Sequence, residues 1–147
     1  MPPDLHKRRR MPWLTSASAV LLALVPATGC AGRGAAETGA VSAASEQFIS
    51  AASMQPGKAC DFLAPATLES IASDDEECAT AMADLGMETL RAGGPEPRAQ
   101  VYGRDAIVQW DDQTMFLARF DGGWLVTAAG CTPRGKDLPY DCSVEGR

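Results

Sequence analysis

Histidine is almost missing from this 147-residue chain, and its scarcity narrows the chemistry available. The one histidine, His6, lies in a basic N-terminal segment, whereas histidine is the commonest general base and a frequent zinc ligand. The sequence also lacks a C-x-x-C pair, a G-x-S-x-G motif and a glycine-rich phosphate-binding loop. We therefore expect no bound metal and no cofactor, and we regard catalysis as disfavoured but open.

Long hydrophobic runs are missing as well. The longest run follows a basic cluster, extends from Trp13 to Ala27, and has 15 residues, whereas a membrane-spanning helix needs roughly 20. A basic cluster, a short apolar run and then small residues are typical of a cleaved signal peptide. Residues 1–29 are therefore predicted to be a signal peptide, with either the general or the twin-arginine export route open.

The residues before Cys30 suggest a lipid anchor. Residues 27–30, Ala-Thr-Gly-Cys, resemble the lipobox of bacterial lipoproteins, although Ala27 stands where Leu, Val or Ile is usual. The resemblance implies cleavage before Cys30 and acylation of its thiol. The alternative is an ordinary signal peptide that is cleaved nearby. The lipoprotein interpretation places the chain at the extracytoplasmic face of the cell membrane, with the lipid on Cys30 as its membrane contact.

Negative charge dominates the mature chain. Residues 1–29 contain four of the 13 basic residues and one of the 19 acidic residues, so the remaining 118 residues carry a net charge of −9. Such a surface repels phosphate groups, so binding to nucleic acid or to anionic lipid is disfavoured. A chain of this length is enough for one domain. We expect a flexible tether over residues 30–40, without apolar periodicity, and a single domain over 41–147.

Four cysteines remain when Cys30 is set aside, and an even number is typical of disulfides in an oxidising compartment. Four cysteines allow three pairings, which the sequence leaves open. Local spacing favours Cys60–Cys78 and Cys131–Cys142. Each of these bonds would close a short loop, which chain-entropy estimates value at about 3 kcal/mol.

The periodicity of the sequence changes halfway along the domain. Apolar residues on one helical face predict a helix that begins near Val41, with further short helices at 60–63, at 65–72 and after Asp74. In the last of these, the inner face would carry Cys78, Met82 and Leu85. Strand-like runs follow at residues 98–102, 106–110, 114–120, 124–129 and 140–144. Helices followed by a meander predict an α+β fold, a cone-like domain with N-terminal helices packed on a curved antiparallel sheet of four to five strands.

This order of elements resembles the cystatin-like, nuclear transport factor 2-like superfamily over residues 42–144. The segment 119–126, with its Gly-Trp-Leu-Val, is similar to a hairpin of that superfamily. Residues 128–133 and 140–142 are similar to a group of actinobacterial lipoproteins of unassigned activity. The superfamily resemblance implies a small apolar pocket between sheet and helices. The aromatic residues that would line it are Tyr102, Trp110, Phe116 and Trp124.

Two functions follow from these patterns. The first is a non-catalytic accessory or binding module of the cell envelope, which docks on an envelope protein through its sheet or helix face. The second is a small-molecule-binding protein, or a weak enzyme, with a pocket of the superfamily's kind. A filled interior would favour the first function, and an apolar cavity with an inward Asp or Tyr would favour the second. The candidate carboxylates are Asp61, Asp111, Asp112 and Asp141.

Overall fold

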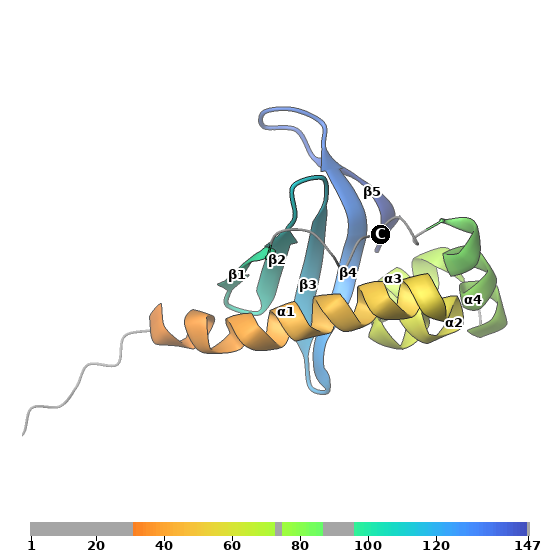
Figure 1. The fold of residues 1–147 in the computed structure, drawn as a ribbon, viewed down its shortest axis with the longest axis horizontal. Coiled ribbons are helices and arrows are strands. Elements are labelled where there is room, and N and C mark those ends of the chain that lie inside the picture. Colours follow the sequence, from red (N-terminus) through yellow and green to blue (C-terminus); the bar gives the residue numbers. More distant parts are fainter. Residues whose placement is uncertain (1–30, 73–74, 87–95, 147) are drawn as a thin grey trace, which may run out of the picture.

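The helices come first in the chain and the strands follow, as Figure 1 shows for the computed structural model. The structure describes residues 31–72, 75–86 and 96–146, without the side chains of residues 31–34 and 76. This part of the chain forms four α-helices, a short 3-10 helix and one five-stranded antiparallel sheet. The predicted α+β class is confirmed. The predicted signal peptide and Cys30 lie outside the described residues.

The helical half contains one long helix and several short ones. The bounds are α1 Ala31–Met54, α2 Pro56–Ala59, η1 Cys60–Phe62, α3 Pro65–Ile71 and α4 Asp75–Asp84. Pro56 and Pro65 begin α2 and α3, where a missing backbone N–H leaves no hydrogen bond unmade. In α4, Cys78 and Met82 are buried as predicted. Leu85 lies just after the helix and is 36% exposed, so its predicted place on the inner face is wrong.

Helix α1 begins at Ala31, ten residues before the predicted start. The expected flexible segment at 31–40 is therefore helical, and the tether prediction is wrong for these residues. The physical reason lies far along the chain, because Glu37 in this segment contacts side chains of the sheet. From Val41 onward the helix buries its apolar face, with Val41, Phe48 and Ile49 at most 1% exposed.

The strands lie in sequence order, and each is antiparallel to its neighbours. Their bounds are β1 Arg98–Tyr102, β2 Asp105–Gln109, β3 Thr114–Phe120, β4 Gly123–Pro133 and β5 Tyr140–Glu145. The predicted ranges of β1 and β3 match, whereas β4 runs four residues further than predicted. Its extra residues pair with β5 as far as Pro133 and Tyr140, and this hairpin projects beyond the rest of the sheet (Figure 1).

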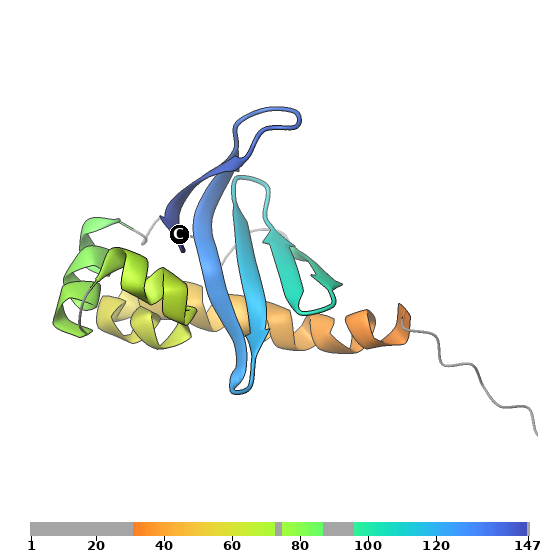
Figure 2. The same cartoon turned by 180° about the vertical axis from the view of Figure 1, so that it is seen from behind.

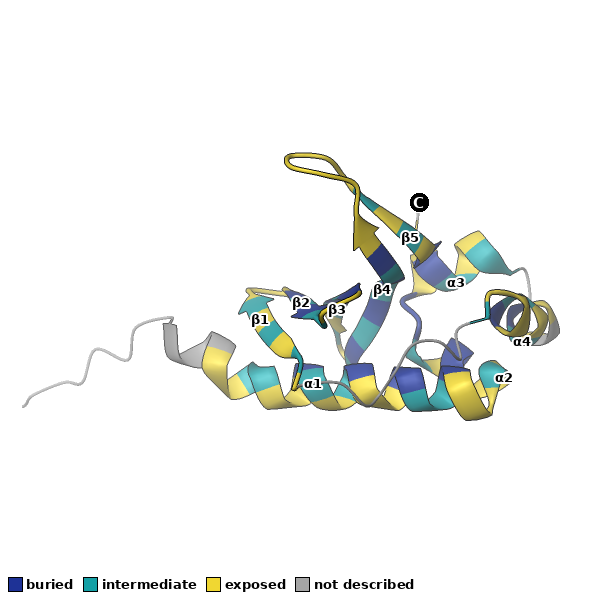
Figure 3. Ribbon diagram, turned by 45° about the horizontal axis from the view of Figure 1, so that its top comes forward, coloured by how far each residue is buried: buried dark blue, intermediate teal, exposed yellow. Residues whose placement is uncertain are grey.

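Helix α1 crosses one face of the sheet, and the core lies between them (Figure 3). Alternation along β3 follows the prediction, because Met115 and Leu117 are buried toward α1 whereas Phe116 lies on the other face. None of the described helices covers that other face of β1, β2 and β3, as Figure 2 shows. The short helix α3 packs instead beside β4 and β5, where Thr67 donates a hydrogen bond to the carbonyl of Thr127 at 3.0 Å.

Two disulfides join neighbouring elements, and both follow the favoured pairing. Cys60–Cys78 links η1 to α4, and Cys131–Cys142 links β4 to β5 at directly opposed positions. Such bonds persist in oxidising compartments, so they indicate an extracytoplasmic location. Among the described helices, none is both long and apolar enough to cross a membrane.

Candidate functional site

The four aromatic residues predicted to share a pocket are not brought together. Tyr102 is 62% exposed, and its hydroxyl donates to the side-chain oxygen of Gln100 at 2.7 Å. Phe116 packs edge-on against Tyr140, with 5.1 Å between the ring centroids. Phe116 and Tyr102 therefore belong to the face of the sheet away from α1.

The remaining two aromatics belong to the core side of the sheet. Trp110 is half-buried against the core, just after β2. Trp124 is 6% exposed and pairs in register with Arg119 of β3, so its ring lies on the α1 side. Phe116 and Trp124 thus occupy opposite faces of one sheet, which prevents them from lining a common cavity between sheet and helices.

Large apolar side chains fill the space between α1 and the sheet. Phe48 and Ile49 from α1 meet Val108, Met115 and Leu117 from the strands, and each of the five is at most 1% exposed. A side chain this buried typically contacts many neighbours at close to crystal density. The interior is therefore filled at the place where the superfamily resemblance implies a pocket.

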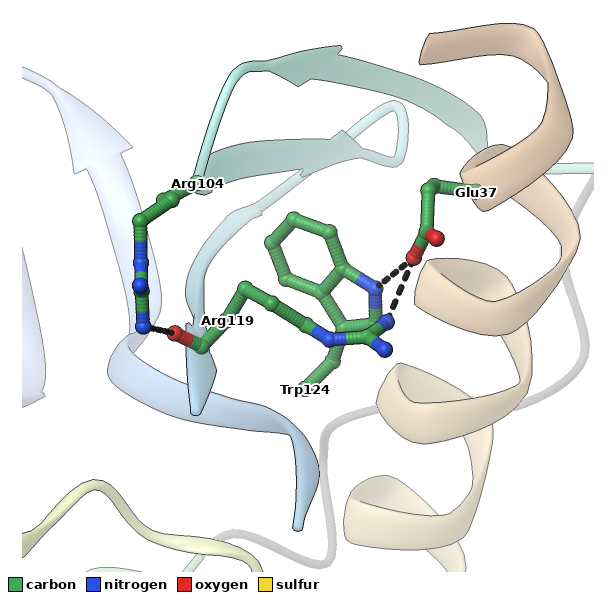
Figure 4. Close-up of polar contacts among 4 residues, drawn as sticks. All are labelled: Glu37, Arg104, Arg119 and Trp124. Atoms are coloured by element: carbon green, nitrogen blue, oxygen red, sulfur yellow. Dashed lines mark hydrogen bonds and ion pairs between the residues drawn. The ribbon is translucent and has the colours of Figure 1, made fainter. Parts of the chain in front are cut away.

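A polar cluster joins the N-terminal part of α1 to the β3–β4 hairpin (Figure 4). One carboxylate oxygen of Glu37 accepts hydrogen bonds from the indole N–H of Trp124, at 2.9 Å, and from the guanidinium of Arg119. The guanidinium carbon of Arg119 lies 5.9 Å from the centroid of the Trp124 ring, within reach of a cation–π contact. Three side chains from two distant parts of the sequence are thus joined by hydrogen bonds.

Arg104 extends this cluster toward the β1–β2 turn. Its guanidinium donates to the backbone carbonyl of Arg119 at 2.7 Å, and its own carbonyl accepts from the Arg119 amide at 2.7 Å. Glu37 and Arg119 are 40% and 43% exposed, so the ion pair alone contributes about 1 kcal/mol or less. The hydrogen bond from the largely buried indole to a charged acceptor is the stronger contact. These contacts therefore hold the N-terminal part of α1 against the β3–β4 hairpin.

A surface groove lies on the outer side of α1, next to α2 and η1. Its volume is about 610 Å³, and both apolar and polar side chains line it. Of the lining residues, Met54 is 70% exposed, and Lys58 and Asp61 form an ion pair of 3.6 Å. The lining residues are Ala43, Glu46, Gln47, Ser50, Ala51, Met54, Gln55, Lys58, Asp61 and Phe62. None of the predicted pocket aromatics belongs to it.

The candidate carboxylates are all at the surface. The Asp61 side chain is 66% exposed, and Asp111, Asp112 and Asp141 are exposed as well. Asp111 and Asp112 occupy the turn between β2 and β3, as the turn interpretation expects. Within the described residues, no three His, Cys, Asp or Glu side chains gather closely enough to hold a metal ion.

Glu37 is the residue that sequence reasoning missed. It lies among alanines and glycines, and its partners are 82 and 87 residues further along the chain, so no local pattern indicates the contact. Gly123-Trp124 was the one available signal, because a tryptophan on the inner face of a strand usually needs an acceptor for its N–H. Comparison with protein-family models, with curated proteins and with solved structures finds no match for this chain.

Proposed function

We propose that this chain is an accessory or binding module of the cell envelope, anchored to the membrane by a lipid on Cys30, which docks on another envelope protein. The observation that carries the proposal is the filled interior between α1 and the sheet. Where the described core side chains leave no space for a ligand, the outer surfaces of the domain are available for recognition. The two disulfides support an extracytoplasmic setting for that role.

The order of elements and the sequence motifs support a finer family assignment. We infer a cystatin-like, nuclear transport factor 2-like domain of the kind found in actinobacterial lipoproteins, with helices first and a meander of five strands after. The superfamily's pocket would be lost here, because Phe48 and Met115 occupy its place. Docking through the groove of α1 and α2, or through the uncovered face of β1 to β3, is consistent with this arrangement.

A second candidate function rests on the groove itself. Its volume of about 610 Å³ falls within the usual range of small-molecule sites, roughly 300–1,000 Å³. The alternative role is then a small-molecule-binding protein or a weak enzyme that uses the helical surface rather than the interior. Lys58 and Asp61 would supply the charged contacts.

Site-specific crosslinking in native membranes tests the docking proposal. A photo-crosslinking residue replaces Gln47 in the groove, or Tyr102 on the opposite face of the sheet, and crosslinked products are identified by mass spectrometry. We expect one envelope protein captured in stoichiometric amounts from one of the two positions. A Gln47→Arg change should abolish capture through the groove without altering the melting temperature. Absence of any crosslinked protein at both positions, together with a small molecule that raises the melting temperature, would favour the second function.

The anchor has its own test. Cys30→Ser should release the mature protein from membranes or leave the precursor uncleaved, because the thiol is the acylation site in the lipobox interpretation. Membrane fractionation and the intact mass of the purified protein measure both effects. Unchanged membrane partitioning of the Cys30→Ser protein would refute the lipid anchor.

A further inference from the structure

We propose that Glu37, Arg119 and Trp124 form a latch that makes the segment after Cys30 a rigid mount, so that the domain keeps one orientation on the lipid bilayer. The inference rests on the proposed lipid on Cys30. Without the latch, the same segment would be the flexible tether that its composition predicts.

The segment has little helical stability of its own. Gly32, Gly34 and Gly39 lie within its ten residues, and glycine is the weakest helix former after proline. The first turn of α1 carries no acidic residue to interact with the helix dipole. Among the α1 side chains that the structure describes, which begin at residue 35, Val41 is the first buried one, and Ala40 before it is exposed. Packing on the core therefore begins only after this segment.

Glu37 connects this weak segment to the sheet. It lies one helical turn before Val41, and its carboxylate binds both Arg119 and Trp124 of the β3–β4 hairpin. Trp124 is itself 6% exposed, so the latch ends on a side chain that the core holds in place. A weak helical end that is fixed to a rigid partner opens less often than the same end without that contact.

The latch sets both the length that the segment after Cys30 spans and the direction in which it extends. The six steps of helix from Ala31 to Glu37 cover about 9 Å in one direction, whereas a flexible segment of ten residues spans about 18 Å in any direction. The N-terminal end of α1 extends past β1, and α2 lies at the opposite end of the helix (Figure 1). The groove lining begins at Ala43, about 18 Å along α1 from Ala31, so a rigid α1 would hold the groove away from the bilayer and open to a partner.

Hydrogen exchange of the full lipidated chain in phosphatidylcholine vesicles tests the latch. Glu37→Ala should speed exchange of the amides of residues 35–40 by about 10-fold, the factor expected for losing a charge-assisted hydrogen bond. Glu46→Ala is the matched control, since it removes the same side chain from the groove side of α1 and should leave these amides unchanged. Gly39→Ala should restore slow exchange in the Glu37→Ala background, because its added Cβ meets nothing within 4 Å and favours the helix.

The orientation of the domain on the bilayer is measured in the same vesicles. The residual fluorescence anisotropy of the two tryptophans in the mature chain should fall in Glu37→Ala and stay high in Glu46→Ala. Unchanged amide exchange in Glu37→Ala, or equal changes in both variants, would overturn the latch. A wild-type protein that fails to sediment with vesicles would instead refute the lipid anchor, while the exchange comparison would still decide whether Glu37 holds the helix.

Discussion

Removal of the Cys60–Cys78 bond should cost this domain a large share of its stability. The bond closes a loop with a sequence separation of 18, for which the chain-entropy relation gives about 3.2 kcal/mol. Cys60 and Cys78 are 7% and 0% exposed, so Cys60→Ala/Cys78→Ala also removes two buried sulfur atoms beside the core. We expect the free energy of unfolding to fall by about 4 kcal/mol, which is a substantial part of the 5–15 kcal/mol of a typical domain.

Urea denaturation of the unreduced protein, followed by circular dichroism at the helical band, measures this loss. The comparison is Cys131→Ala/Cys142→Ala, whose loop has a separation of 11 and an entropic value of about 2.8 kcal/mol. The first pair should be the more costly, because Cys142 is only half-buried. A fall of less than about 1 kcal/mol for Cys60→Ala/Cys78→Ala would refute the argument from loop closure and burial.

Two further changes test the packing around β4. Gly130→Ala should lower the free energy of unfolding by about 2 kcal/mol, because Gly130 has φ +63° and an added Cβ would lie 2.9 Å from the hydroxyl of Ser143. Gly122→Ala, whose Cβ meets nothing within 4 Å, is the control in the same denaturation assay; an equal loss in both would contradict the argument from backbone strain. Thr67→Val should lower the free energy of unfolding by about 1 kcal/mol, since it removes the hydrogen bond from the Thr67 hydroxyl to the Thr127 carbonyl. The loss is no larger because that carbonyl still accepts a hydrogen bond from the Gly146 amide. A melting temperature equal to that of the wild type would show that this buried hydroxyl contributes nothing.

The strands were predictable because their signals are local. Alternation along 114–120 and the glycine at the β3–β4 turn set the bounds of β3 and the start of β4 within a residue. The same alternation could have separated Phe116 from Trp124, because cross-strand pairing places Trp124 opposite Arg119 and on the other face from Phe116. The four aromatic residues were predicted to share a pocket because they were grouped by residue type and not by the face of the sheet on which each lies.

The start of α1 was not predictable in the same way. Local composition at 31–40 favours a flexible chain, and the contact that overrides it is made by Glu37 with residues more than 80 positions away. The end of β4 was missed for a similar reason, because the pairing of Pro133 with Tyr140 depends on how far β5 returns alongside it. Contacts between distant segments decided both boundaries.

The topology also sets an order of assembly. Every strand pairs with its neighbour in sequence, so the sheet can grow hairpin by hairpin with short loop closures. Helix α1 is synthesised before the strands, yet Val41, Phe48 and Ile49 share one core with strand residues that come about 50 residues later, as well as with the nearby helical segments. Until β1 to β4 are present, this apolar stripe lacks its partners in the sheet, and the part of it that α2 and η1 leave uncovered is open to aggregation or to a chaperone. Docking of α1 is therefore the step in which folding of this domain is most exposed to error.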